Sequence, residues 1–89
     1  MQVEIYRLAS EPVILQVSDG GTVRDVFSHP SSGKAIGREG SLLDAAEEAY
    51  GSIEALGNIR VNGLTANLDS PVPDGATILV VPKVQGGQL

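Results

Sequence analysis

The sequence of 89 residues predicts a small α+β fold in which a helical layer covers a mixed sheet. Two alternating apolar runs, residues 2–8 and 13–18, predict an N-terminal hairpin. A capped helical segment follows at Thr22, and the chain closes with an apolar strand at residues 77–84. The helical segment supplies the crossover that lets the last strand pair in parallel with the first.

Each strand of the hairpin is justified by its alternation. Val3 and Ile5 lie on one face of the first strand, and Val13 and Leu15 lie on one face of the second, with the residues between them facing the other way. Residues 9–12 contain a proline and form the predicted turn.

The first helix is expected to be short. Thr22 stands at its N-cap with Asp25 three residues later, a spacing typical of a capping box, and the pair His29-Pro30 stops it. Residues 30–40, with three glycines and two serines, are predicted to be a loop.

A second helix is predicted to begin after Ser41, with Asp44 at the matching position, and to end at Gly57. Gly51 weakens it by roughly 1 kcal/mol relative to alanine, so a bend or break is expected there. One apolar stripe follows the helical period: Leu42, Ala46, Ala49, Ile53 and Leu56.

The last third of the chain is predicted to be strands. Asn62-Gly63 is a strong signal for a type I′ hairpin turn between residues 59–61 and 64–68. Residues 69–73 are irregular. The final strand is apolar on both faces, which favours a central place in the sheet.

Composition restricts the function classes. The net charge is −5, which argues against nucleic acid and anionic membranes as partners. The absence of cysteine excludes disulfides and a thiol nucleophile in this chain. Without a signal segment or a run of roughly 20 apolar residues, we expect a cytoplasmic protein, and a monomer.

No catalytic or cofactor site is predicted. Gly33-Lys34 lacks the glycine and the hydroxyl residue of a phosphate-binding loop, since Ser28 and Ala35 occupy those positions. His29 is the sole histidine and has no partner set for a metal ion or a nucleophile. The acidic residues of the second helix are interpreted as a solvated face. We therefore expect a protein that is not an enzyme and holds no cofactor or metal.

The motifs at the C-terminal end carry a family resemblance. The run Ile59-Arg60-Val61-Asn62-Gly63, and then Asp74-Gly75, an apolar strand, Pro82 and Gly86-Gly87, resembles the end of β-grasp, ubiquitin-like proteins. It is similar in particular to the prokaryotic sulfur carriers of molybdopterin and thiazole biosynthesis. The resemblance implies a β-grasp fold of four to five strands with one main helix and a short extra helix.

The resemblance also implies a division of the chain. Residues 1–85 would form the β-grasp domain, and residues 86–89 a flexible tail with a two-residue extension. In this family a terminal glycine carboxylate is adenylated and then transferred. Because Gln88 and Leu89 follow, the resemblance implies a precursor that a zinc-dependent JAB-type peptidase trims between Gly87 and Gln88.

Three functions stay open. The first is a bacterial ubiquitin-like modifier, activated at Gly86-Gly87 by an ATP-dependent activating enzyme, with or without a conjugating enzyme, and joined to a target amine. The second is a sulfur carrier with a C-terminal thiocarboxylate. The third is a noncovalent β-grasp binding module. The insertion at residues 30–40 favours the first over the second.

The surface for the activating enzyme is expected beside the tail. By resemblance it is the exposed sheet face near Arg60, Lys83, Val84 and Gln85. If the protein forms chains on itself, Lys34 in its predicted loop is expected to be a more accessible acceptor than Lys83.

Overall fold

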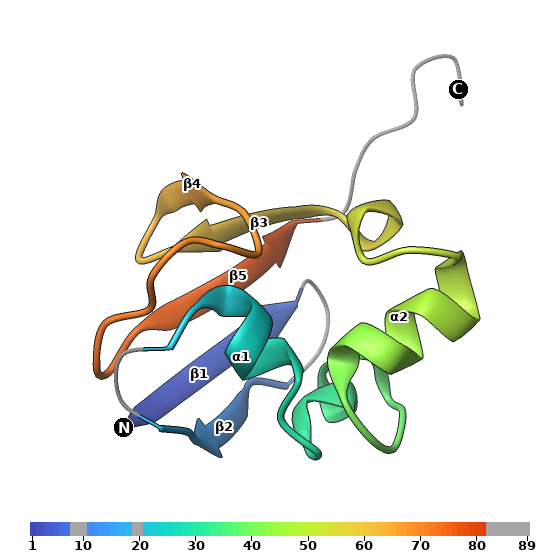
Figure 1. The fold of residues 1–89 in the computed structure, drawn as a ribbon, viewed down its shortest axis with the longest axis horizontal. Helices are drawn as coiled ribbons and strands as arrows, with labels where there is room; N and C mark the ends of the chain where they lie inside the picture. Colours follow the sequence, from blue (N-terminus) through green and yellow to red (C-terminus); the bar gives the residue numbers. More distant parts are fainter. Residues whose placement is uncertain (8–10, 19–20, 82–89) are drawn as a thin grey trace.

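The computed structural model describes residues 1–7, 11–18 and 21–81 (Figure 1). Five strands and two α-helices, with two short 3-10 helices, follow one another along the chain. In chain order the elements are β1 (Gln2–Arg7), β2 (Val13–Gln16), α1 (Val23–Phe27), η1 (Ser32–Ile36), α2 (Leu42–Tyr50), η2 (Glu54–Leu56), β3 (Asn58–Val61), β4 (Leu64–Ala66) and β5 (Thr77–Val81).

The strands form a single mixed sheet in the order β2-β1-β5-β3-β4. β1 pairs antiparallel with β2 and parallel with β5, so that Ile5 lies beside both Val13 and Ile78. β5 is thus the central strand, as its apolar sequence predicted. The predicted parallel pairing of the first and last strands is also confirmed.

The helical layer covers only one face of this sheet (Figure 1). Val3, Ile5, Ile78 and Val80 point into the core beneath it, each at most 1% exposed. On the other face Leu79 is 37% exposed. β5 is therefore central in the plane of the sheet, as predicted, and the helical layer covers it on one side only.

α1 begins with the predicted capping box. Thr22 Oγ1 accepts from the backbone N–H of Asp25, and the Asp25 carboxylate accepts from the backbone N–H of Thr22. The backbone N–H groups of Val23 and Arg24, which lack partners within the helix, donate to the carbonyls of Ser70 and Leu68. The start of α1 is thereby fixed to the segment that precedes β5.

The predicted loop at residues 30–40 contains a 3-10 helix, η1. Its first residue, Ser32, is fully buried and acts as a junction. The Ser32 hydroxyl is 2.9 Å from the Phe27 carbonyl and 2.7 Å from the His29 carbonyl, and it accepts from Leu42 N at 2.7 Å. One side chain thus connects the end of α1 to the start of α2, and that connection has no signature in the periodicity of the sequence.

Gly33 explains why η1 packs so closely on the segment after it. Its N–H donates to the Gly40 carbonyl at 2.8 Å, and a Cβ at Gly33 would lie 2.6 Å from that same oxygen. Glycine is required here for close approach of two backbones, since any side chain would displace residues 38–40.

The second helix ends where the sequence indicated a weak point. Ser41 caps α2 as predicted, but the helix stops at Tyr50, with Gly51 at φ 88° as its C-cap. The remaining stripe residues, Ile53 and Leu56, are buried, but Leu56 belongs to the separate short helix η2. Gly57 therefore closes η2 rather than one long helix.

The turn between β3 and β4 is the predicted one. Asn62 and Gly63 have φ values of 50° and 85°, as a type I′ turn requires. The Asn62 side chain also accepts a hydrogen bond from Thr77 N at 2.9 Å. The hairpin is thereby joined to the first residue of the central strand.

Candidate functional site

The end of β5 is the place from which the chain continues toward the diglycine. β5 ends at Val81, which lies opposite Asn58 of β3, and residues 82–89 follow. Most of the predicted site residues fall outside the described part of the chain, namely Lys83, Val84, Gln85, Gly86, Gly87 and Gln88. Their roles stay predictions, whereas the sheet that carries them can be described.

The uncovered side of the sheet forms a continuous surface beside that exit point. We call it the open face, made up of Glu4, Tyr6, Ile14, Arg60, Thr65, Thr77 and Leu79. Across its middle, Tyr6, Leu79, Arg60 and Thr65 lie next to one another on four neighbouring strands. Arg60, predicted to contact a partner, therefore lies beside an exposed leucine at the centre of this surface.

Tyr6 and Glu4 form the polar margin of the open face. The Tyr6 hydroxyl donates to the Glu4 carboxylate at 2.7 Å. That hydrogen bond, together with the charge of Glu4, raises the pKa of Tyr6 above its ordinary value.

Arg7 lies on the covered side at the same end of the sheet. It is the last residue of β1 and is paired with Val80, one residue before β5 ends. Its Nε is buried and has no hydrogen-bond partner in the part of the chain described. A guanidinium therefore stands close to the point where the chain leaves the sheet, a placement that the strand pattern of the sequence did not indicate.

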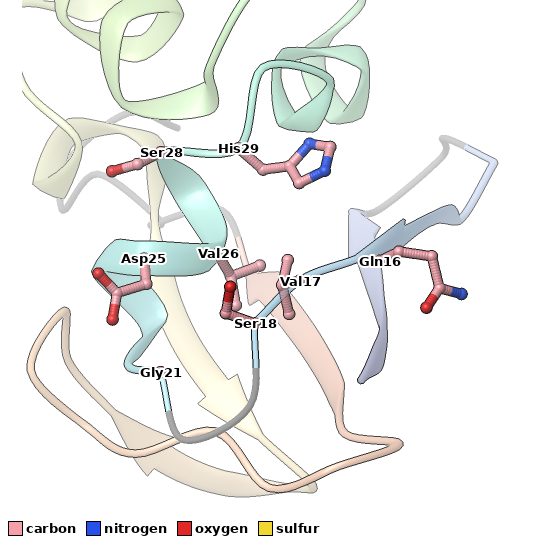
Figure 2. A pocket seen from close by; sticks show the side chains of 8 residues that line it. All are labelled: Gln16, Val17, Ser18, Gly21, Asp25, Val26, Ser28 and His29. Atoms are coloured by element: carbon pink, nitrogen blue, oxygen red, sulfur yellow. The ribbon is translucent and has the colours of Figure 1, made fainter.

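A hollow of about 500 Å³ lies between the edge strand β2 and α1 (Figure 2). Asp25, Ser28 and His29 all line it, so it brings together the residue types of a nucleophile, a base and an acid. Figure 2 shows the Asp25 and Ser28 side chains on the opposite side of the helix from the His29 ring.

Each of these three side chains has a local partner. The Asp25 carboxylate caps Thr22, the Ser28 hydroxyl donates to the carbonyl of Arg24, and His29 Nδ1 accepts from the backbone N–H of Ser31. No hydrogen bond joins the three to one another. Asp25, Ser28 and His29 therefore serve the ends of α1 and do not form a nucleophile–base pair.

Residues 1–7, 11–18 and 21–81 hold no group of three histidine, cysteine, aspartate or glutamate residues placed to bind a metal ion. Across the same residues, no helix has the length and apolar character needed to cross a membrane.

Lys34 is not in a loop, contrary to the expectation from its glycine-rich surroundings. It lies on η1, exposed to solvent, and lines a second hollow of about 560 Å³ together with the start of β2. Glu11, Pro12, Val13 and Ile14 form the β2 side of this hollow.

Sequence reasoning missed the residues whose role depends on which side of the sheet is covered. Ile14, on the open face, is 57% exposed. Alternation separates the two sides of a strand, but it does not say which side a helix covers when both are apolar. Only the polar positions of the open face around Arg60 could have been found from the alternation along the strands.

Comparisons with known proteins support the fold. No family model matches the chain, and no curated protein matches it. Among solved structures, SAMP1 from Haloferax volcanii is similar with a TM-score of 0.58 and 22% identity, covering 98% of this chain and 100% of that one.

A second similar structure is the complex of subunits 1 and 2 of the molybdopterin-converting factor from Helicobacter pylori 26695. The match has a TM-score of 0.55 and 22% identity over 98% of this chain and 100% of the matched chain. The chain therefore has the α+β fold of the β-grasp, ubiquitin-like proteins.

Proposed function

We propose that the protein is a ubiquitin-like modifier whose working group is the carboxylate of Gly87. The single observation that carries the proposal is the diglycine itself, Gly86-Gly87, which comes in the chain after the central strand of a β-grasp sheet. Glycines without side chains can enter a narrow active site, and a carboxylate can be activated by adenylation. SAMP1, a small modifier, supports this use of the fold.

The proposed sequence of events has three steps. A peptidase of the zinc-dependent JAB type removes the residues after Gly87, and an activating enzyme then converts the carboxylate to an acyl adenylate with ATP. Finally the acyl group passes to an amine of a target protein, directly or through a partner thiol. This chain supplies the acyl group and the docking surface, and its partners supply the catalysts.

The open face is the proposed docking surface for the activating enzyme. It lies at the end of β5 from which the tail continues, and it combines exposed apolar area at Leu79 with the positive charge of Arg60. Interfaces of this kind have an apolar centre and a polar margin. Lys83, Val84 and Gln85 would extend the same surface along the tail.

A sulfur carrier is the second candidate. The similarity to a chain of the molybdopterin-converting factor complex specifically favours it. After the same trimming and adenylation, sulfide delivered by a partner would attack the acyl adenylate of Gly87 and displace AMP, leaving a thiocarboxylate in which sulfur replaces one oxygen.

A tryptic digest of proteins from the cells that make this chain separates the two functions. Because Lys83 precedes Val84-Gln85-Gly86-Gly87, trypsin would leave a Val-Gln-Gly-Gly remnant on every modified lysine. The proposal predicts such remnants on other proteins, and their loss when Gly86 and Gly87 are deleted. A chain that carries sulfur on Gly87 while no protein carries the remnant would establish the sulfur carrier instead.

A further inference from the structure

The outer edge of β2 carries backbone groups that the sheet does not use. Met1 N donates to the Val17 carbonyl at 2.6 Å, and Val17 N donates back to the Met1 carbonyl at 2.9 Å. Because such doubly bonded pairs alternate along an antiparallel ladder, Ile14 and Gln16 have their N–H and C=O groups directed away from β1. β2 is an edge strand, so none of the other strands within residues 1–7, 11–18 and 21–81 pairs with those groups.

Both large hollows follow this same edge. The hollow of about 500 Å³ adjoins Gln16 and is bounded by His29, and Figure 2 shows Gln16 at the end of the strand and Val17 just after it. The hollow of about 560 Å³ adjoins Ile14 and is bounded by Lys34 of η1. We call the outer edge of β2 with these two hollows the edge trough. Its shape and its outward backbone groups fit an extended peptide that adds one strand to the sheet.

Lys34 provides an acceptor amine at one end of the edge trough. The chain has only two lysines, and the other one, Lys83, is part of the tail. Lys34 is exposed, whereas the amine of Met1 is engaged with the Val17 carbonyl.

We propose that the edge trough binds the C-terminal tail of a second copy of this chain, and that Lys34 is the amine to which Gly87 of that copy is joined. This inference rests on the proposed function, because it uses the same activated carboxylate. Eight residues follow β5, and six of them, residues 82–87, span up to about 20 Å when extended. That length suffices to follow the whole of β2.

The direction and register of the bound tail follow from the need to bring its C-terminal glycines close to Lys34. If the tail runs antiparallel to β2, its C-terminal glycines come to residues 11–13, at the end of the trough where Lys34 lies. Lys83 then pairs with Gln16 and Gln85 pairs with Ile14, the two residues with outward backbone groups. Pro82, which has no N–H, falls opposite Val17, whose own N–H is already used.

The joining reaction is an ordinary acyl transfer. The unprotonated amine of Lys34 attacks the carbonyl carbon of Gly87 while that carbon is held as an acyl adenylate or as a thioester on a partner. A C–N bond forms, the C–O or C–S bond breaks, and AMP or the thiol leaves with the electron pair of that bond. The amine proton passes to the leaving group or to solvent, and the ATP used by the activating enzyme supplies the driving force.

The test is tryptic mass spectrometry on the chain isolated from the cells that make it. We expect a peptide covering residues 25–38 with a Val-Gln-Gly-Gly branch on Lys34, because trypsin does not cleave at an acylated lysine. Lys34→Arg should abolish this peptide and the linked dimer. Lys83→Arg is the matched control, since it preserves the tryptic site and should leave the branch on Lys34.

The outcomes separate this inference from the proposed function. Remnants on other proteins with none on Lys34 would overturn the inference and leave the modifier function in place. The absence of remnants from every protein would overturn both. A linked dimer that persists in Lys34→Arg would also overturn the inference.

The role of the edge is tested with the chain and a synthetic peptide, Pro-Lys-Val-Gln-Gly-Gly. In a nuclear magnetic resonance titration, the peptide should shift the amide resonances of Ile14 and Gln16. Ile14→Pro removes an N–H that β1 does not use, so it should keep the fold and weaken peptide binding by about tenfold, whereas Ile14→Val should not. Shifts confined to β4 or to Arg60 and Leu79, away from β2, would contradict binding in the edge trough.

Discussion

Neighbouring residues of the central strand lie in two different environments. Ile78 is fully buried under the helical layer, whereas Leu79, the next residue, is 37% exposed on the open face. Both are large aliphatic side chains in the middle of the same sheet. Apolar side chains on the covered face stabilise the fold, and those on the open face leave apolar area available for a partner.

The largest effect should come from truncating the covered face. Ile78→Ala removes a fully buried side chain and should lower the free energy of unfolding by about 2–5 kcal/mol. Leu79→Ala on the open face should cost less than about 1 kcal/mol. Denaturant unfolding monitored by circular dichroism measures both, and equal losses would contradict the assignment of the two faces.

Substitution of Ser32 tests whether the stability of the helical layer depends on the hydrogen bonds of this buried hydroxyl. Ser32→Ala leaves the N–H of Leu42 buried without its partner and should lower the free energy of unfolding by about 1–3 kcal/mol. Ser28→Ala is the control, because that exposed hydroxyl bonds only the carbonyl of Arg24 and its loss should cost about 0.5 kcal/mol or less. A Ser32→Ala variant as stable as the control would show that the junction is dispensable.

On the open face the expected effect is on conjugation and not on folding. Arg60→Glu reverses a charge at the centre of the proposed docking surface and should reduce the yield of conjugates in cells by roughly 3- to 10-fold. Its thermal unfolding should stay close to that of the original chain. Arg38→Glu makes the same charge change in the segment after η1 and should leave the yield of conjugates unchanged. An equal loss of yield in both variants would show that the net charge, and not the position of Arg60, causes the loss.

The smallest effect concerns Tyr6. Because its folded pKa is raised, the hydrogen bond to Glu4 contributes stability below about pH 10 that is lost as the pH rises through the raised pKa. Glu4→Gln should bring the pKa of Tyr6 back toward its ordinary value. Titration of the Tyr6 ring resonances measures this, with the Tyr50 ring as the internal reference, and an unchanged midpoint would contradict the role of Glu4.

The sequence predicted the features that depend on local chemistry. The caps at Thr22 and Ser41 and the turn at Asn62 follow from short-range rules, and the structure confirms them. The parallel pairing of the first and last strands, which is also confirmed, follows instead from the crossover rule for strand connections. Alternation in the first strand likewise identified the buried positions Val3 and Ile5.

The features that depend on tertiary packing were not predictable. η1 has no apolar period, and it is held by the buried hydroxyl of Ser32 and the close approach at Gly33, which only the folded chain brings about. The exposure of Leu79 and the free edge at Ile14 depend on the order of strands and on the side that the helices cover. The diglycine, in contrast, was visible at once, because its proposed role needs the absence of side chains and not a partner in the fold.

The central claim is that the carboxylate of Gly87 is the group that this fold presents to its partners. The most direct measurement is the intact mass of the chain isolated from the cells that make it. The account predicts a population that has lost Gln88 and Leu89 and ends at Gly87, and that disappears when Gly87 is replaced by a residue the peptidase rejects. A chain that keeps Gln88 and Leu89 in every molecule, while it performs its function in the cell, would contradict the account.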